Sequence, residues 1–300
     1  MSMTSRSTYA MDELRFWKYH GTGNDFVLFE DLADELTIGD ELARRLCDRR
    51  FGIGADGTIR VTRGSAPDED FFMDHRNSDG TLAQMCGNGI RCLGKLVVER
   101  GLTEATEITV GTRSGPKHLV MRVHDGVVTA VTVEMGPATF ARGALPMTGD
   151  ATEPFIGEPF EVDGRTYKAT ALSMGNPHLV LFVEEDPEDV DVARIGPLVE
   201  NDERFPERTN VEFVAVQGDG VKVRVWERGV GETMACGTGA CASVVAANEA
   251  GLVGRRASAT FPGGVLQIER QGDEHVLLTG PAVRVAEGVV DPAWVRGGEA

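Results

Sequence analysis

Residues 86–102 read CGNGIRCLGKLVVERGL, and residues 236–252 read CGTGACASVVAANEAGL. When one stretch is set under the other without a gap, Cys, Gly, Gly, Glu, Gly and Leu coincide at an offset of 150 residues (236 − 86). Each stretch has an apolar middle and ends at a glycine, Gly101 or Gly251, which suits the left-handed residue that closes many helices. We therefore expect one buried helix of the same kind in each half of the chain.

Two fainter echoes flank this repeat. Gly23-Asn24 precedes FVLF and Gly175-Asn176 precedes HLVLF, while MGPA at 135–138 matches TGPA at 279–282. Because all three echoes keep the same order, the chain is predicted to contain two copies of one fold. The expected fold class is α/β (α+β): two pseudo-symmetric β-rich domains, each a curved sheet or barrel wrapped around its central helix.

Apolar and alternating runs predict the strands. We expect strands at 26–29, 58–61, 108–110, 127–133, 179–183, 210–216, 221–226 and 265–269, and a short helix at 38–48. The first domain is predicted to span 15–134 and the second 135–280, with a C-terminal strand at 281–297 joining the first. Residues 1–14 are polar and aperiodic, so they are expected to form a disordered tail.

Composition excludes several classes of protein. Three hundred residues exceed one ordinary core, so two domains are the default. A formal net charge of −17 without a cluster of Lys and Arg disfavours binding to nucleic acid or to anionic membranes. The chain has no apolar run long enough to span a bilayer and no apolar signal segment, so we expect a cytoplasmic protein.

The five cysteines are Cys47, Cys86, Cys92, Cys236 and Cys241. An odd number without a secretion signal argues against a disulfide framework, and the spacing contains no C-x2-C pair for zinc. Cys92 and Cys241 do not coincide in the repeat, so they are expected to be core residues, as is Cys47. Free thiols in a reducing compartment are the simplest interpretation.

Cys86 and Cys236 each stand just before Gly-x-Gly at a predicted helix start. The free amides and the positive end of the helix dipole are expected to lower the pKa of such a thiol towards neutrality. A single Cys-Gly-x-Gly segment would favour a purely structural role for the cysteine, as the cap of a helix. Two copies related by a pseudo-twofold axis instead predict two thiols facing one bound carbon, as acid and base on its opposite sides, with helix amides holding a carboxylate.

Six segments carry a family resemblance: HGTGNDFVLF (20–29), RRFGIGADG (49–57), RNSDGTLAQMCGNGIRC (76–92), MGNPH (174–178), ERFPERTNVEF (203–213) and WERGVGETMACGTGAC (226–241). Together they resemble the diaminopimelate epimerase family, from about Phe16 to Val290. The resemblance implies that two thiols interconvert LL- and meso-diaminopimelate, a step in lysine and peptidoglycan precursor synthesis, without pyridoxal phosphate or metal. It also implies a small amino-acid substrate and is compatible with a homodimer.

The resemblance assigns roles to residues at the matching positions. It implies Cys86 and Cys236 as the catalytic thiols, assisted by His178 and Glu227, with His178 paired to Cys86 and Glu227 to Cys236. The reacting carboxylate is expected on the amides of Gly87, Asn88, Gly237 and Thr238. The distal end of the substrate is expected to contact Asn24, Asn77, Asn176, Asn210 and Arg228, because amides offer donors and acceptors and Arg228 can hold a carboxylate with two bonds.

One position departs from the family and leaves recognition open. Some members carry Gln after the GIGxD motif where this chain has Gly57. A substrate contact there would survive if it used the main chain and would change if it used the side chain.

Two alternatives remain. A proline-racemase-like isomerase shares the two-thiol logic, but its imino-acid substrate has no distal end for Arg228 to bind. A non-catalytic binding protein would not need both cysteines. Taken one at a time, several of these residues also have a purely structural interpretation. Asn24 could be a turn residue, His178 a half-buried structural histidine, and Glu227-Arg228 a surface ion pair.

Overall fold

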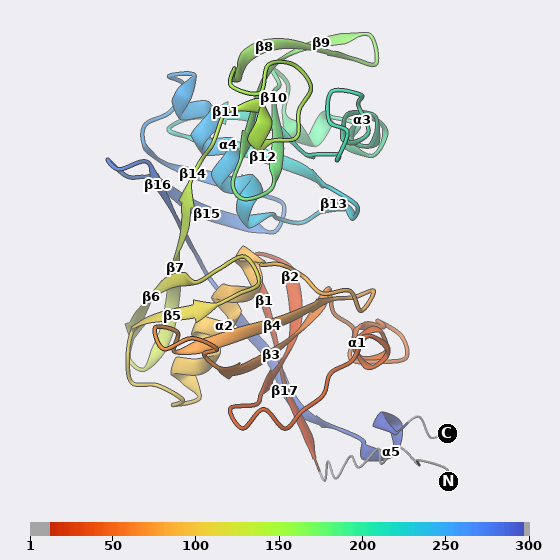
Figure 1. Ribbon diagram of the computed structural model, residues 1–300, viewed down its shortest axis with the longest axis vertical. Coiled ribbons are helices and arrows are strands. Elements are labelled where there is room, and N and C mark those ends of the chain that lie inside the picture. Colours follow the sequence, from red (N-terminus) through yellow and green to blue (C-terminus); the bar gives the residue numbers. More distant parts are fainter. Residues whose placement is uncertain (1–12, 297–300) are drawn as a thin grey trace.

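The computed structural model describes residues 13–296, and its strands and helices form two stacked lobes (Figure 1). The helices are α1 (Asp40–Cys47), α2 (Gly87–Glu99), α3 (Val192–Glu200), α4 (Gly237–Glu249) and α5 (Pro292–Val295), with single 3-10 turns at Arg142–Ala144 and Pro187–Asp189. None of these helices is long and apolar enough to cross a bilayer.

The strands of the first lobe are β1 (Leu14–Gly21), β2 (Asn24–Glu30), β3 (Gly57–Arg63), β4 (Phe71–Asn77), β5 (Glu107–Gly111), β6 (Lys117–His124), β7 (Val127–Pro137) and the C-terminal β17 (Val283–Val290). Those of the second lobe are β8 (Phe155–Val162), β9 (Arg165–Ser173), β10 (Pro177–Phe182), β11 (Asn210–Gln217), β12 (Gly220–Glu227), β13 (Gly231–Thr233), β14 (Arg256–Phe261), β15 (Gly264–Arg270) and β16 (His275–Gly280). Every strand predicted from the sequence is present. Most lie within a few residues of their expected bounds, but the C-terminal strand predicted at 281–297 ends at Val290 and is followed by α5.

The two lobes repeat one order of strand pairing. In the first, the order is β17-β1-β2-β3-β4-β5-β6-β7, and only the β2–β3 and β4–β5 pairs are parallel. In the second, it is β8-β9-β10-β11-β12-β14-β15-β16, and only β10–β11 and β12–β14 are parallel. The duplicated β-rich fold predicted from the echoes is confirmed. The added β7–β16 pair links the lobes, and β7 runs past residue 134, so the domain boundary at 134/135 stays a proposal.

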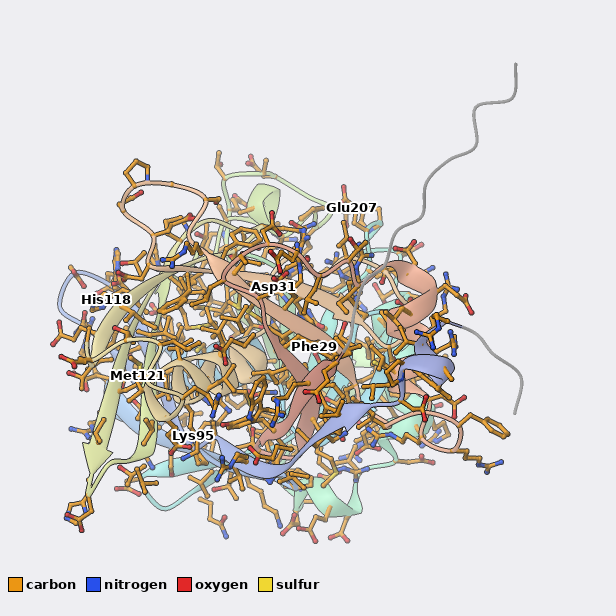
Figure 2. All side chains as sticks on the ribbon, turned by 90° about the horizontal axis from the view of Figure 1, so that it is seen from below. Phe29, Asp31, Lys95, His118, Met121 and Glu207 are labelled. Carbon is orange, nitrogen blue, oxygen red and sulfur yellow. The ribbon has the colours of Figure 1, made fainter. Side chains whose placement is uncertain are left out.

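Each lobe curves around the helix that the repeat predicted. Both helices end as expected, at Gly101 and Gly251, with φ of 67° and 72°, a conformation that glycine adopts without strain. Helix α4 is buried almost all round and is rich in Ala and Val, as an enclosed helix must be. In the lower lobe, Met121 of β6 lies against α2, where a side chain on Gly94 would meet its sulfur at 3.3 Å (Figure 2).

A short helix covers the outer face of each sheet. Helix α1 packs on the outer residues of β2, including Val27 and Phe29, and α3 packs on those of β10 and β11, including Leu181 and Phe213. The predicted tail lies almost wholly outside the described residues. Its last member, Leu14, instead begins β1 and is buried, because it pairs with Val290 of β17.

Candidate active site

The first turns of α2 and α4 meet where the two lobes join. A Cβ placed on Gly87 would lie 3.4 Å from the Cα of Gly237, and one placed on Gly237 would lie 3.1 Å from the Cα of Gly87. Only residues without a side chain allow this backbone approach. The caps of the two helices, Cys86 and Cys236, directly precede these glycines and are therefore brought together from positions 150 residues apart (236 − 86).

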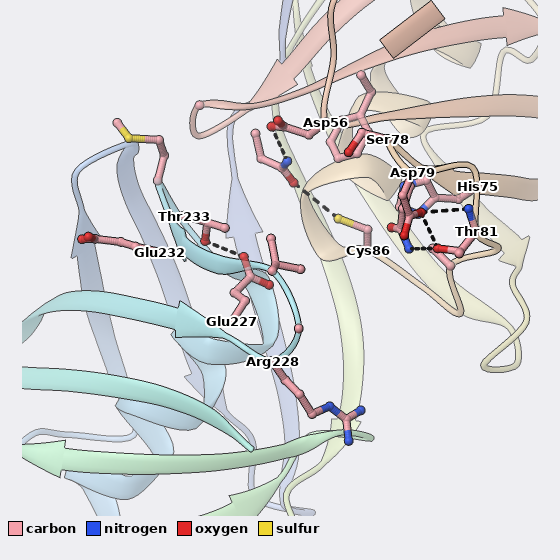
Figure 3. A pocket seen from close by; sticks show the side chains of 18 of the residues that line it. Asp56, His75, Ser78, Asp79, Thr81, Cys86, Glu227, Arg228, Glu232 and Thr233 are labelled. Atoms are coloured by element: carbon pink, nitrogen blue, oxygen red, sulfur yellow. Dashed lines mark hydrogen bonds between the residues drawn. The ribbon is translucent and has the colours of Figure 1, made fainter. Parts of the chain in front are cut away.

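A cleft of about 1260 Å³ opens beside this junction. Its lining includes five predicted site residues: Asn24, Asn77, Cys86, Glu227 and Arg228. Figure 3 shows Cys86 and Glu227 on opposite walls, with Arg228 below Glu227 in this view. The other predicted residues lie behind this lining, on the strands and helix turns that support it.

On the first wall, a chain of amides holds the Cys86 thiol. Cys86 Sγ donates to Asn24 Oδ1 at 3.6 Å, and Asn88 Nδ2 donates to the same oxygen at 3.2 Å. Asn24 Nδ2 in turn donates to Asp56 Oδ2 at 2.8 Å. Asn88 Nδ2 also donates to Ala235 O at 2.9 Å, so the amide beside Cys86 ties the two lobes together.

In the second lobe, behind the residues that line the cleft, the buried Cys236 thiol lies 3.4 Å from Thr238 Oγ1. Asn176 Nδ2 donates to that hydroxyl at 3.3 Å, and Asn176 Oδ1 lies 3.0 Å from His178 Nε2. His178 Nδ1 lies 2.7 Å from Glu212 Oε1, and both of these side chains are fully buried. Four predicted residues therefore form one hydrogen-bonded row, which ends at a carboxyl group that the sequence did not single out.

Both thiols are protonated at neutral pH in this structure. Burial raises the pKa of Cys86 to about 11, against hydrogen bonds from the amides of Gly89 and Asn88, and burial also raises the pKa of Cys236 well above its usual value. The expectation that the helix amides lower the pKa of both thiols towards neutrality is wrong, because desolvation of the thiolates outweighs the amides. A neighbouring group must therefore accept the proton of a thiol before that thiol can act as a base.

Glu227 is placed to exchange protons with a thiol. Burial raises the pKa of its carboxyl group, while Thr233 and Cys236 act against that shift, and Thr233 donates a hydrogen bond to it. The Glu227 carboxylate in turn raises the pKa of both Cys86 and Cys236. One carboxyl group is therefore electrostatically coupled to both sulfurs.

The residues expected at the distal end of the substrate come from both lobes. Asn77 Nδ2 donates to Thr81 Oγ1 at 3.0 Å. On the other side, Asn210 Oδ1 accepts from the main-chain amide of Arg228 at 2.9 Å, while the Arg228 guanidinium donates to a single carbonyl, at 3.2 Å. Because one carbonyl occupies only one of its five donors, the guanidinium can also bind a carboxylate.

Gly57 lies behind the cleft and makes room for a histidine. A Cβ at this position would lie 2.8 Å from His75 Nε2 and 2.6 Å from Arg76 O. His75 lines the cleft, and its two ring nitrogens have no hydrogen-bond partner among the described residues. Burial lowers the pKa of His75 to about 4, so the ring is neutral at pH 7. The imidazole therefore occupies the space that a side chain at position 57 would need.

One expected pairing is absent from this structure. Both ring nitrogens of His178 are engaged, by Asn176 and Glu212, so His178 does not pair with Cys86. The row of hydrogen bonds connects it instead to Cys236, because β10 carries His178 towards the first turn of α4.

Sequence reasoning missed three residues that support the site: Asp56, His75 and Glu212. Asp56 stood within the GIGAD segment, and Glu212 within TNVEF, so a polar residue inside a family motif was the available signal. His75 gave no such signal, because Gly57 comes close to it only in the folded sheet, where His75 lies opposite Ile59, two residues along the same strand.

Comparison with known proteins fits this geometry. The sequence profile of the diaminopimelate epimerase family matches residues 16–141 and 170–285. This chain belongs to the diaminopimelate epimerase family. It is similar to the diaminopimelate epimerases of Moorella thermoacetica (47% identity, covering 92% of this chain and 98% of that protein) and Leptospira biflexa (43% identity, covering 93% and 99%).

Solved structures extend the likeness of the fold beyond the diaminopimelate epimerases. A hydroxyproline epimerase from Agrobacterium vitis superposes with a TM-score of 0.70 at 15% sequence identity, with 96% of each chain covered. A predicted epimerase from Pseudomonas aeruginosa superposes with a TM-score of 0.65 at 17% identity, covering 92% of this chain and 99% of that one. At such low identity the likeness concerns the fold alone.

Proposed function

We propose that this protein is a diaminopimelate epimerase, an isomerase that interconverts LL- and meso-diaminopimelate with two thiols and no cofactor. One observation carries the proposal: α2 and α4 meet at Gly87 and Gly237, each directly after a cysteine, so that Cys86 lines the cleft and Cys236 lies buried at the helix junction beside it. Inversion of a carbon centre needs a base on one side and an acid on the other. A duplicated fold supplies both groups from equivalent positions.

The reaction balances with the groups present. Glu227 accepts the proton of the Cys236 thiol, and the thiolate then takes the α-proton of the substrate. The electron pair of the broken C–H bond moves into the carboxylate, where the amides of Gly87, Asn88, Gly237 and Thr238 stabilise the added charge. The Cys86 thiol donates its proton to the opposite side of the carbon. Glu227 then gives its proton to the Cys86 thiolate, so both thiols are protonated again, and the reverse reaction uses the same thiols in exchanged roles.

Both lobes contribute to selection of the distal centre. Asn24 and Asn77 belong to the first lobe, whereas Asn176, Asn210 and Arg228 belong to the second. Amide groups and a guanidinium suit an ammonium and a carboxylate on one carbon. A substrate that lacks this distal pair, such as proline, leaves Arg228 and the amides without partners and is expected to react poorly.

Isotope exchange tests the proposal directly. During the first turnovers of LL-diaminopimelate in D2O, the meso product should carry solvent deuterium at one α carbon only. Deuterium at both α carbons in those turnovers would contradict the distal assignment, and the absence of any deuterium would contradict the acid–base reaction. Proline under the same conditions is the control for the racemase alternative.

Two expectations from the sequence belong to the same proposal. A cytoplasmic location suits two catalytic thiols that must stay reduced, and the described cysteines are all free. A homodimer is the assembly expected from the resemblance. Cell fractionation and light scattering of the purified protein test these two points separately.

A further inference from the structure

The buried carboxyl group of Glu212 has no role in the two-thiol reaction as described. It lies on β11, and Glu212 Oε1 would contact a Cβ on Gly239 at 2.7 Å, so it packs directly on the first turn of α4. A Cβ on Gly239 would also lie 3.5 Å from Cys236 Sγ. Glu212 Oε1 and Cys236 Sγ therefore both lie close to Gly239 in the first turn of α4.

The second oxygen of this carboxyl group is not satisfied. Glu212 Oε2 is buried and has no hydrogen-bond partner among the described residues. A buried carboxylate with an unpaired oxygen is costly, so the group holds or shares a proton. Burial raises the pKa of Glu212, with the His178 ring acting against it. The 2.7 Å contact between Glu212 Oε1 and His178 Nδ1 is where a proton held by this carboxyl group would lie.

The hydrogen bonds from this pair to Cys236 run in a single direction. Because Asn176 Nδ2 donates to Thr238, Asn176 Oδ1 faces the ring, and His178 Nε2 must carry the hydrogen. The Thr238 hydroxyl accepts from Asn176 and is left with its own hydrogen to donate, and Cys236 Sγ lies 3.4 Å away. When the Thr238 hydroxyl donates to Cys236 Sγ, every donor in this row points towards the sulfur.

We propose that Glu212 is a positioning residue for the epimerisation: it fixes the tautomer of His178 and so directs the Thr238 hydroxyl onto Cys236. The role in epimerisation rests on the proposed function, whereas the hydrogen bonds from Glu212 to Cys236 do not depend on a substrate. A hydroxyl that donates to sulfur stabilises the thiolate over the thiol. Without Glu212, His178 Nδ1 loses its partner, and the row of donors can reverse.

The reactivity of Cys236 measures this effect without any substrate. Alkylation by iodoacetamide requires the thiolate, and peptide mass spectrometry follows Cys236 and Cys86 separately in the full-length protein. In Glu212→Ala we expect alkylation of Cys236 at pH 8 to fall about tenfold, and its pH profile to move upwards, with Cys86 unchanged. Glu212→Gln should stay within threefold of the wild type, because its amide can donate to His178 Nδ1 as a protonated carboxyl group does.

A purely electrostatic role for Glu212 predicts the opposite change in the alkylation rate of Cys236. Glu227 and Glu212 are the charged groups whose carboxylates raise the pKa of Cys236. If Glu212 acted only as a negative charge, its removal would speed the alkylation of Cys236. Faster alkylation in Glu212→Ala, or an unchanged rate, would overturn the proposal.

A second variant shows whether the effect passes through Thr238. Thr238→Val should slow Cys236 alkylation as Glu212→Ala does, and the double variant should be no slower than either single one. Additive losses would contradict a shared path. Glu99→Gln, which alters a carboxyl group bonded to Lys95 far along α2, is the matched control and should leave both thiols unchanged. Because the readout needs no turnover, failure of the proposed function would appear only in the deuterium experiment.

Discussion

Gly87 and Gly237 touch backbone to backbone, so the two lobes have no side chain between the first turns of α2 and α4. The Asn88 side chain reinforces the same contact by donating to Ala235 O in the other lobe. A methyl group on Gly87 would meet the Cα of Gly237 at 3.4 Å, an ordinary contact, whereas one on Gly237 would meet the Cα of Gly87 at 3.1 Å. The relative placement of the two thiols therefore depends most on the absence of a side chain at Gly237.

The variant Gly237→Ala tests this dependence. The added methyl group lies 3.1 Å from the Cα of Gly87, closer than ordinary contact, and the backbone must yield. We expect kcat to fall about tenfold or more, because small displacements of reacting groups are costly. Gly272→Ala, with nothing within 4 Å of its added carbon, should behave as the wild type. Equal activity of the two variants would contradict the argument.

Loss of either catalytic thiol should abolish epimerisation. Cys86→Ser and Cys236→Ser replace the thiol with a hydroxyl group of much higher pKa, so kcat should fall on the order of 10³-fold or more. Cys241→Ala, which removes a fully buried thiol that the reaction does not use, should keep its activity but unfold at a lower temperature. Steady-state kinetics and thermal unfolding distinguish the two kinds of loss, and a serine variant with a tenth of normal activity would contradict the two-thiol reaction.

Because His75 packs closely against Gly57, a side chain introduced at position 57 is expected to destabilise the fold. Gly57→Gln places its Cβ 2.8 Å from His75 Nε2 and 2.6 Å from Arg76 O. The cost of such overpacking is about 1–3 kcal/mol of unfolding free energy. Urea unfolding of Gly57→Gln beside wild type measures it. A variant as stable as wild type would show that the strand can shift without cost.

The neutral His75 ring makes stability depend on pH. Burial lowers its pKa to about 4, with Arg113 acting in the same direction and Asp74 against it, whereas the unfolded chain binds the proton near 6.5. The unfolded state therefore binds more protons between these values, and this part of the stability, complete above pH 6.5, is lost as pH falls towards 4. From pH 7 to pH 5 the wild type should lose about 2 kcal/mol more than His75→Phe. Parallel losses in urea unfolding would contradict the assignment.

The sequence predicted the parts of the fold that local pattern controls. Helices α2 and α4 were predicted because a Cys-Gly-x-Gly start and a closing glycine mark both ends. Helix α3 was not, since Pro197 lies inside it and interrupts the pattern. The strands that the sequence did not predict are β1, β4, β6, β8, β9, β13, β14 and β16. In β8, a register shift between Ile156 and Glu158 interrupts the alternation of buried and exposed residues.

The site was predictable in its residues but not in its electrostatics. Motif position identified Cys86, Cys236 and their neighbours, yet the direction of the thiol pKa shift depends on burial, which the sequence does not show. The same limit applies to Glu212, whose place in TNVEF resembles any strand residue. Only the parallel pairing of β10 with β11, in which His178 lies opposite Asn210, reveals its contact with His178.

Strand β17 closes the sheet of the first lobe by pairing with β1 from Leu14 to His20. During synthesis this partner leaves the ribosome only after the entire second lobe has emerged. The second lobe can thus complete its sheet first. Until then, one edge of β1 stays unpaired, because its partner β17 lies some 260 residues later in the chain. Contacts of such long range slow folding, so the order of assembly should run against the order of translation.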